Sequence, residues 1–388
     1  MKQSSRQAVA ASHVFDGSAV HADHAVIIED TRIVALIPRH ELSSDISLLE
    51  LPDGTWLAPG FIDVQVNGGG DVLFNDDPSP EGIHAIVAAH RKFGTTSLLP
   101  TLISDTDAKM AAARAAVEGA IGKEPGVLGI HWEGPFLSPE RAGVHDRNML
   151  RAPDASHEEL LTSLRAGVTL VTLAPEQVPR SFIRNIVNAG VRVALGHSMA
   201  TYDQTRQALD DGLTGFTHLF NAMRPLMSRE PGPIAAALET PGAFYGLIVD
   251  GEHVAPAMLR LALRGTGTAM LVTDAMPPVG GQRTGFTLYG REIVSAGGSC
   301  TTTDGTLAGA ALDMATAVSN CVRTLGVPLP DALRLASLAP ATFLGLQDSL
   351  GRIAPGYRAD LVAFEPNAVL VRATWVAGTR FANGHNGI

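Results

Sequence analysis

Eight short apolar runs, each ending in polar or Gly/Pro-rich residues, alternate with helical stretches through the middle of the chain. The helical stretches are rich in Ala and include residues 82–93, 107–121 and 201–211. A strand followed by a helix, repeated in this way, gives parallel βαβ units. Eight such units over residues 57–346 predict an α/β fold, the (β/α)8 TIM barrel. The expected strands are residues 57–67, 96–103, 127–134, 167–176, 191–198, 215–223, 244–254 and 269–276.

The two ends of the chain have a different pattern from the middle. Residues 25–37 and 359–381 each contain two short strand-like runs around a polar turn. We therefore expect residues 1–56 and 347–388 to form a small β-sandwich domain built from both flanks. The catalytic barrel domain is then expected to cover residues 57–346.

The composition is that of a globular protein, with 45% hydrophobic and 18% charged residues. The formal net charge of −10 argues against nucleic acid as a partner, because nucleic-acid binders usually carry a basic surface. The sequence has no apolar run of about 18 residues that could span a membrane. It also starts without the apolar stretch of a signal peptide. We therefore expect a cytoplasmic protein that binds neither nucleic acid nor membrane.

Polar side chains close the expected strands, at the end where TIM barrels carry their active sites. Glu133, His197 and His218 offer one carboxylate and two imidazoles, a set that suits Zn²⁺ with a fourth position open to water. Bound zinc lowers the pKa of water to about 7, which makes hydroxide available at neutral pH. Asp274 is the natural group to take a proton from that water and return it to a leaving amine. The other polar strand-end residues are Gln65, Asn67 and His253.

Each of these residues alone also has an ordinary structural interpretation. A single His at a strand end is more often a core or loop residue than a metal ligand, and Asp274 could cap the turn before Ala275. Several such groups at the ends of different strands favour the metal site. His131 lies two residues before Glu133 on the same strand face, and we interpret it as a core or supporting residue.

Seven motifs occur in a fixed order along nearly the whole chain. They are PGFIDVQVNGGG (59–70), HWEGPFLSPERAGVH (131–145), LGHSMATYDQ (195–204), THLFNAMRPLMSREPG (217–232), VDGEHV (249–254), LVTDAMPPVG (271–280) and DGTLAGA (304–310). With these motifs the sequence resembles the amidohydrolase superfamily and, within it, the N-acetylglucosamine-6-phosphate deacetylase family. The resemblance implies hydrolysis of the acetamide of N-acetyl-D-glucosamine 6-phosphate, which gives D-glucosamine 6-phosphate and acetate.

The resemblance also implies a role for individual residues. Glu133, His197 and His218 would hold the catalytic metal, and Asp274 would be the general base and then the general acid. His145 and His253 would contact the sugar and the acetamide. Further sugar and phosphate contacts would fall on Val144, Asn221, Ala222, Arg229, Leu307, Ala308 and Gly309. Arg229 would reach into the site of a neighbouring subunit, which implies a homodimer, and a guanidinium suits a phosphate ligand.

The sequence departs from the superfamily pattern at the end of the first barrel strand. Many members carry His-x-His there, whereas this chain has Gln65 and Asn67 around Val66, neither of which is a good zinc ligand. The Lys that becomes carbamylated and bridges two metals in other members is also missing, because the fourth strand ends at Glu176. Both departures favour one divalent metal per subunit, with zinc as the expected ion. Gln65 and Asn67 would then hydrogen-bond water or order the vacant position.

Three other functions compete with this interpretation. The first is a deacetylase for a related substrate such as N-acetylgalactosamine 6-phosphate. The second is a cyclic amidase for a dihydropyrimidine-type ring, which usually needs two metals and is therefore disfavoured by Gln65 and Asn67. The third is a non-catalytic sugar-phosphate sensor, which is disfavoured by the intact Asp274.

Overall fold

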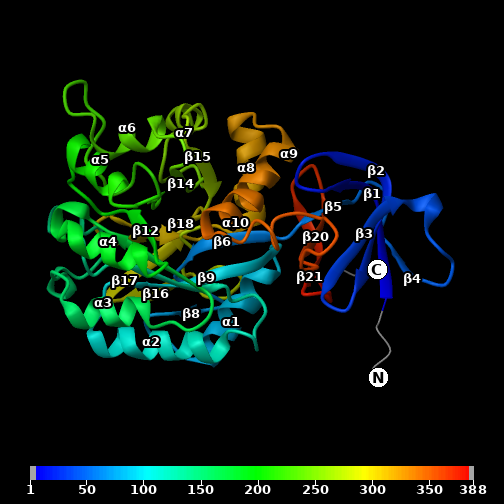
Figure 1. Ribbon diagram of the computed structural model, residues 1–388, viewed down its shortest axis with the longest axis horizontal. Helices are drawn as coiled ribbons and strands as arrows, with labels where there is room; N and C mark the ends of the chain where they lie inside the picture. Colours follow the sequence, from blue (N-terminus) through cyan, green and yellow to red (C-terminus); the bar gives the residue numbers. More distant parts are fainter. Residues whose placement is uncertain (1–5, 384–388) are drawn as a thin grey trace. The chain divides into compact units, whose positions relative to one another are not determined.

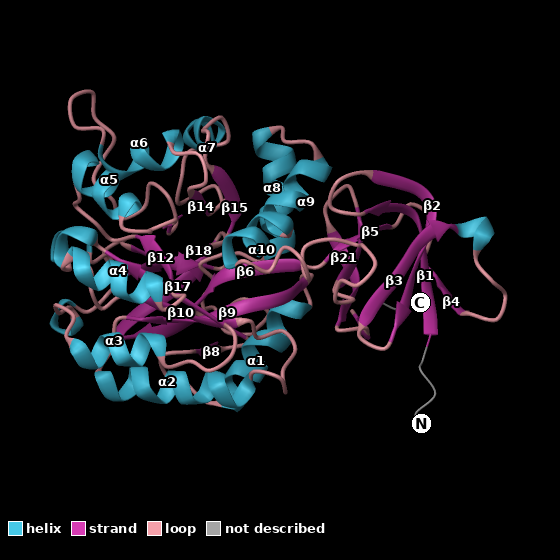
Figure 2. Ribbon diagram, viewed as in Figure 1, coloured by secondary structure: helices cyan, strands magenta, loops and turns pink. Residues whose placement is uncertain are grey.

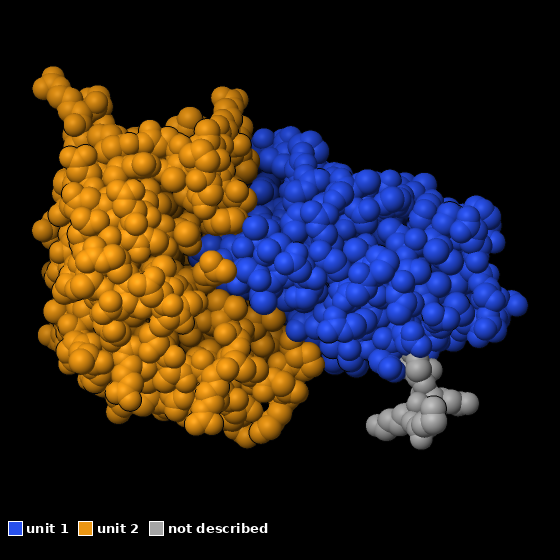
Figure 3. All heavy atoms as spheres, in the orientation of Figure 1, with its two compact units in different colours: residues 1–63, 90–97, 313–388 blue, residues 64–89, 98–312 orange. Residues whose placement is uncertain are grey.

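The structure is a computed structural model that describes residues 6–383. Two compact units can be distinguished within this range. The first comprises residues 6–63, 90–97 and 313–383, and the second comprises residues 64–89 and 98–312, as coloured in Figure 3.

A sheet of eight parallel strands forms the barrel (Figure 1), which confirms the predicted fold class. The sheet runs in chain order from the first strand to the last, as repeated βαβ units require. An isolated parallel bridge between Val66 and Ala275 joins the first strand to the residues that follow the last one, and so closes the barrel. The strands are β6 (Phe61–Val66), β9 (Thr95–Ile103), β10 (Gly129–Glu133), β11 (Val168–Leu173), β12 (Arg192–Leu195), β13 (Gly215–Phe216), β14 (Phe244–Leu247) and β15 (Thr268–Leu271).

Helices follow the barrel strands and lie around the outside of the sheet (Figure 2). Side-chain caps fix several of their starts: Thr106 accepts a hydrogen bond from the Lys109 amide, and Thr201 forms a capping box with Gln204. Helix α4 buries Phe182 and its neighbours at helical spacing, so one face packs on the barrel. The helices are α1 (Pro80–Arg91), α2 (Asp107–Ala120), α3 (Ala155–Thr162), α4 (Arg180–Asn188), α5 (Tyr202–Asp210), α6 (Gly232–Glu239) and α7 (Pro256–Ala262).

A four-stranded antiparallel sheet follows the last barrel strand, and the sequence analysis did not predict it. Its buried side chains share a small apolar core with residues from the barrel side, and the members of this core are Leu73, Ile103, Met276, Leu288, Ile293, Cys300 and Ala308. The sheet places the DGTLAGA segment next to the barrel strands. The Ala310 amide at the end of this segment donates to the Asp274 carbonyl at 2.9 Å. Its strands are β16 (Gly285–Leu288), β17 (Arg291–Ala296), β18 (Ser299–Thr302) and β19 (Leu307–Ala310).

The two flanks of the chain share one eight-stranded sheet, which confirms the expected β-rich flank domain. Strand β20 from the C-terminal flank pairs antiparallel with β5 from the N-terminal flank. Val14, Ile28, Leu361 and Trp375 come from both flanks and are all fully buried in one apolar core. The strands are β1 (Arg6–Phe15), β2 (Val20–Glu29), β3 (Arg32–Pro38), β4 (Ser47–Glu50), β5 (Trp56–Pro59), β20 (Leu361–Glu365), β21 (Leu370–Val376) and β22 (Thr379–Ala382).

The expected strand 57–67 is divided between the two sheets. Its first part is β5 of the flank sheet and its second part is β6 of the barrel, with Gly60 at the break. A side chain at Gly60 would collide with Thr96, since an added Cβ would lie 2.2 Å from the Thr96 Oγ1. Three helices after the barrel strands belong to the first compact unit by their contacts. They are α8 (Met314–Leu325), α9 (Leu329–Ala336) and α10 (Leu338–Leu344).

Candidate active site

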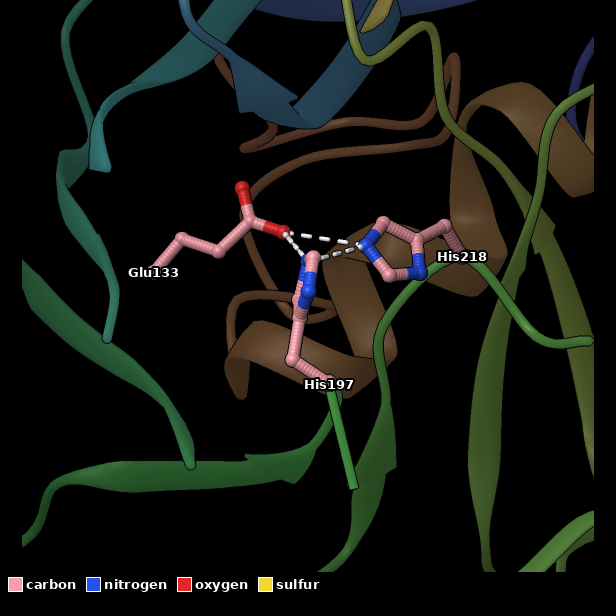
Figure 4. A group of neighbouring side chains, drawn as sticks. All are labelled: Glu133, His197 and His218. Atoms are coloured by element: carbon pink, nitrogen blue, oxygen red, sulfur yellow. Dashed lines mark hydrogen bonds and ion pairs between the residues drawn. The ribbon is translucent and has the colours of Figure 1, made fainter. Parts of the chain in front are cut away.

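Glu133, His197 and His218 meet at the carboxyl end of the barrel, as the strand order predicts (Figure 4). The Oε1 atom of Glu133 lies 3.2 Å from His197 Nε2 and 3.0 Å from His218 Nε2. The two Nε2 atoms are 3.1 Å apart, so three potential ligand atoms face a single point. One carboxylate and two imidazoles are a common donor set for a divalent metal such as zinc.

The backbone around the two histidines fixes their orientation. Nδ1 of His197 donates to the carbonyl of Arg141 at 2.7 Å, which orients the ring so that Nε2 faces Glu133 and His218. A second hydrogen bond of this kind is the usual support for a metal-binding His. Both residues have positive φ angles, 47° for His197 and 33° for His218, in a region that side chains disfavour. The residues present therefore fit a metal through their donor atoms and their orientation.

The charge states of Glu133, His197 and His218 depend on one another. Burial alone would raise the pKa of Glu133, but the hydrogen bonds from His197 and His218 outweigh burial and hold that pKa well below its ordinary value. Burial would lower the pKa of His218, but its hydrogen bond to the Glu133 carboxylate raises it instead. The carboxylate of Glu133 is therefore ionised at neutral pH, as a ligand to a cation must be.

Asp274 lies beside this group and is held by two side-chain amides. Gln65 Nε2 donates to Asp274 Oδ1 at 3.0 Å and also to Glu133 Oε1 at 3.2 Å. Asn67 Nδ2 donates to the same Asp274 oxygen at 2.6 Å. Gln65 therefore contacts both carboxylates and Asn67 contacts that of Asp274, roles that the sequence analysis did not assign to them. Burial and the nearby charge of Glu133 raise the pKa of Asp274, which suits an acid–base group.

A cavity of about 290 Å³ opens over these residues, within the second unit. It has the size and the mixed polar and apolar lining of a small-molecule site. Asp274 and the three candidate metal ligands are 2–8% exposed, so they form its buried floor. The sequence-predicted residues that line the cavity are Asn67, Glu133, Val144, His145, His197, His218, Asn221, Ala222, His253, Asp274, Leu307 and Gly309.

His145 and His253 line the cavity with defined proton positions. The amide of Ser104 donates to Nδ1 of His145 at 3.3 Å, so the neutral ring carries its proton on Nε2 and can donate from there. Burial and the neighbouring His197 lower the pKa of His145 to about 3, which keeps this ring neutral. His253 Nδ1 lies 2.6 Å from the Asp250 carboxylate and donates to it. His253 then presents Nε2, the ring nitrogen that Asp250 does not bind, for contact with a ligand.

Two of the expected contact residues lie elsewhere. Arg229 is exposed on the loop between His218 and α6, and it does not line the cavity of its own chain. Ala308 is fully buried in the core of the β16–β19 sheet, between Leu307 and Gly309, which do line the cavity. Its side chain therefore packs against the small sheet.

His131 supports the barrel interior, as expected. It is 1% exposed and lies 2.7 Å from the hydroxyl of Thr172 and 3.3 Å from that of Thr101. Burial lowers the pKa of His131 to about 4, so the ring is neutral at physiological pH. It is not one of the three residues whose ligand atoms converge.

Several supporting residues were missed by the sequence analysis. Asp250, which orients His253, has a visible signal, because it lies three residues before His253 in the VDGEHV motif. Arg141 lies inside the HWEGPFLSPERAGVH motif, but nothing in the sequence indicates that its carbonyl holds His197. Ser104 has no signal at all, since its contact with His145 joins segments 41 residues apart.

Comparison with known proteins identifies the family. The model of the amidohydrolase family matches residues 56–383, and that of the NagA composite domain matches residues 8–55. The chain belongs to the amidohydrolase family. This confirms the resemblance that the seven motifs indicate, and it identifies this amidohydrolase as a hydrolytic enzyme.

Curated relatives are similar to this amidohydrolase over most of its length. N-acetylgalactosamine-6-phosphate deacetylase of Shewanella sp. (strain ANA-3) is 42% identical, and the match covers 87% of this chain and 86% of the relative. N-acetylglucosamine-6-phosphate deacetylase of Haemophilus influenzae is 36% identical, and the match covers 89% of this chain and 91% of the relative.

Solved structures have the same fold. The N-acetylglucosamine-6-phosphate deacetylase of Pasteurella multocida has a TM-score of 0.94 at 35% identity, covering 97% of this chain and 100% of that one. A mutant of the Mycobacterium smegmatis enzyme, in complex with N-acetyl-D-glucosamine-6-phosphate, has a TM-score of 0.90 at 33% identity, covering 98% and 100%. Within residues 6–383, no helix of this amidohydrolase is long and apolar enough to cross a membrane.

Proposed function

We propose that this amidohydrolase removes the acetyl group of N-acetyl-D-glucosamine 6-phosphate, giving D-glucosamine 6-phosphate and acetate. The observation that carries the proposal is the buried floor of the cavity, where Asp274 lies beside Glu133, His197 and His218. Relatives named as amino-sugar-phosphate deacetylases, at 32–42% identity, support the choice of substrate.

The residues of the chain divide the chemistry among them. Glu133, His197 and His218 would hold one divalent cation, for which we propose zinc, and such an ion polarises a carbonyl and lowers the pKa of water. Asp274 takes a proton from the attacking water as it adds to the acetamide carbon. Nε2–H of His145 donates to the acetamide oxygen as negative charge develops there. Asp274 then returns the proton to the amine nitrogen as the C–N bond breaks.

The remaining cavity residues would recognise the sugar phosphate. We propose that His253 accepts a hydrogen bond from a sugar hydroxyl, because Asp250 already occupies its Nδ1–H. Asn221, Ala222, Val144 and the backbone near Leu307, Ala308 and Gly309 would contact the sugar and the phosphate.

We also propose a homodimer in which Arg229 reaches the site of the neighbouring subunit. The support is that Arg229 is exposed and lies on a loop with the exposed apolar residues Leu226 and Met227. The catalytic domain would cover residues 57–346, with residues 1–56 and 347–388 as the small β domain. A phosphorylated substrate favours a cytoplasmic location.

The second candidate substrate is N-acetylgalactosamine 6-phosphate. The observation that favours it is the 42% identity to a relative named as an N-acetylgalactosamine-6-phosphate deacetylase. The two sugars differ only in the configuration at C4, so a hydrogen bond to the C4 hydroxyl would decide between them.

The test is the release of free amine and acetate from both phosphorylated sugars and from unphosphorylated N-acetylglucosamine. We expect turnover of N-acetylglucosamine 6-phosphate with the highest kcat/KM of the three. A higher kcat/KM for the galactosamine derivative would transfer the proposal to that substrate. No release from any of them, by protein supplied with zinc, would refute the deacetylase proposal.

A further inference from the structure

Arg141 is the one Lys or Arg side chain among the described residues that line the cavity. The other ordinarily charged lining residues are carboxylates, namely Glu133, Glu140 and Asp274. A cavity with this lining repels an anionic ligand unless cations compensate for the carboxylates. A metal on Glu133, His197 and His218 would offset this negative charge at the buried floor of the cavity. Among the described lining residues, the guanidinium of Arg141 supplies the other positive charge.

The backbone of Arg141 is fixed in place. The residue ends a short 3-10 helix, η2 (Pro139–Arg141), and its amide donates to the Ser138 carbonyl at 2.9 Å. Its carbonyl accepts the 2.7 Å hydrogen bond from Nδ1 of His197. The root of the side chain is therefore held next to a candidate metal ligand.

The side chain of Arg141 is half-buried, and most of its donors have no partner. Nε donates to the sulfur of Met199 at 3.0 Å, which steadies the stem. The two terminal nitrogens, Nη1 and Nη2, make no hydrogen bond or ion pair with any residue in the range 6–383. The guanidinium of Arg151, ten residues further on, instead donates hydrogen bonds to Asp107, His157 and backbone carbonyls.

We propose that Arg141 binds the phosphate of the substrate that is processed in its own subunit. A guanidinium with both terminal nitrogens free can bind a phosphate through two parallel hydrogen bonds. In an amino-sugar 6-phosphate, the phosphate and the acetamide lie at opposite ends of the ring. A long side chain rooted beside the metal ligands and free at its tip is suited to reach that far end. This inference rests on the proposed function and differs from the contact proposed for Arg229, which would come from a partner.

The test compares Arg141→Met with Arg141→Lys. Methionine keeps an unbranched stem without charge, and lysine keeps the charge but lacks the fork of donors. We expect Arg141→Met to lower the ratio of kcat/KM for the phosphorylated sugar to kcat/KM for the unphosphorylated sugar by about 10- to 100-fold, the loss expected for hydrogen bonds to a charged group. The loss should appear mainly in KM, and Arg141→Lys should recover part of it.

Arg147→Met is the matched control, because Arg147 is exposed six residues further on and does not line the cavity. It should leave the ratio unchanged. Bound zinc per chain should equal that of the wild type in both Arg141 variants, since the carbonyl that holds His197 remains. An unchanged ratio in Arg141→Met, or an equal loss with both sugars, would overturn the proposal.

Binding measured by calorimetry separates this inference from the proposed deacetylation. Glucose 6-phosphate carries the phosphate and has no acetamide, so its affinity does not depend on catalysis. We expect Arg141→Met to weaken its binding by about 10- to 100-fold. Equal affinity for wild type and variant would refute the role of Arg141, whereas failure of wild type to deacetylate any sugar refutes only the proposed function.

Discussion

The core of the flank sheet and the floor of the barrel cavity are both buried, but they consist of opposite kinds of residues. The flank core contains Val14, Leu361 and Trp375, which are apolar and fully buried. The cavity floor contains Glu133 and Asp274, which are 2% and 8% exposed. Burying apolar surface stabilises a protein by about 25 cal/mol per Å², whereas burying an ionisable group is costly unless it has a partner.

The hydrogen bonds of the cavity offset part of that cost. Gln65 donates to both carboxylates, and the carbonyl of Arg141 holds His197. The backbone is also in a disfavoured conformation there, with positive φ at His197, His218 and Asp274. The flank core therefore stabilises the fold, whereas the cavity floor gives up stability to keep polar groups in place.

The substitution Asp274→Asn should change the chemistry of the cavity floor more than any other substitution proposed below. It removes the proton acceptor but keeps an oxygen that can accept from Gln65 and Asn67. We expect amine release to fall by about 10²- to 10⁴-fold. Bound zinc and the melting temperature should not decrease, because a buried charge is lost. Turnover near that of the wild type, in an assay of amine release, would refute the role of Asp274.

For a substitution in the flank core we expect the opposite result, namely a lower free energy of unfolding with unchanged catalytic turnover. Leu361 is fully buried in β20, so Leu361→Ala should lower the free energy of unfolding by about 2–5 kcal/mol. Turnover per folded molecule should stay unchanged.

The matched control for this prediction is Leu370→Ala in β21, because Leu370 is 42% exposed. It should cost less than about 1 kcal/mol. Chemical denaturation of both variants measures the difference. Equal destabilisation by the two substitutions would contradict the assignment of the flank core.

Gln65→Leu probes the support of the cavity floor. The variant removes the amide that joins Glu133 and Asp274 while keeping a side chain of similar size. We expect kcat to fall by about 10- to 100-fold, the effect of losing a residue that orients a catalytic group or a metal ligand. Steady-state kinetics measures this effect. An unchanged kcat would mean that the hydrogen bonds from Gln65 to Glu133 and Asp274 have no role in catalysis.

The smallest expected effect is a dependence of stability on pH. The pKa of Asp274 is raised in the folded protein, so between its ordinary value of about 3.9 and the raised value the native state holds a proton that the unfolded state has released. Stability from this group therefore falls as the pH rises through that interval. The free energy of unfolding should be measured for metal-free wild type and Asp274→Asn at several pH values. The value for the variant should rise relative to that for the wild type as the pH rises. A constant difference would contradict the raised pKa.

The sequence predicted those parts of the molecule that follow from strand order. His197, His218 and Asp274 could be placed together because the carboxyl ends of parallel strands converge in a barrel. The division of the expected strand at Gly60 could not be predicted, because it depends on the close approach of Thr96.

Most of the missed site contacts join segments that lie far apart in the sequence. Gln65 was expected to contact water, and its actual partners Glu133 and Asp274 come from other strands. The small sheet of residues 285–310 is a different case, because its first three strands pair with their neighbours in sequence, and the Gly297-Gly298 turn between two of them is a local hairpin signal. The carbonyl of Arg141 has no signal in the sequence, since any residue carries one.

We propose that Glu133, His197 and His218 hold one metal on which deacetylation depends. The most direct measurement titrates zinc into chelator-treated protein and follows bound metal and amine release from N-acetylglucosamine 6-phosphate in the same samples. We predict that both saturate together at one zinc per chain, and that Glu133→Gln loses both. Activity that needs a second zinc, or that persists in metal-free protein, would contradict a catalytic site with a single metal.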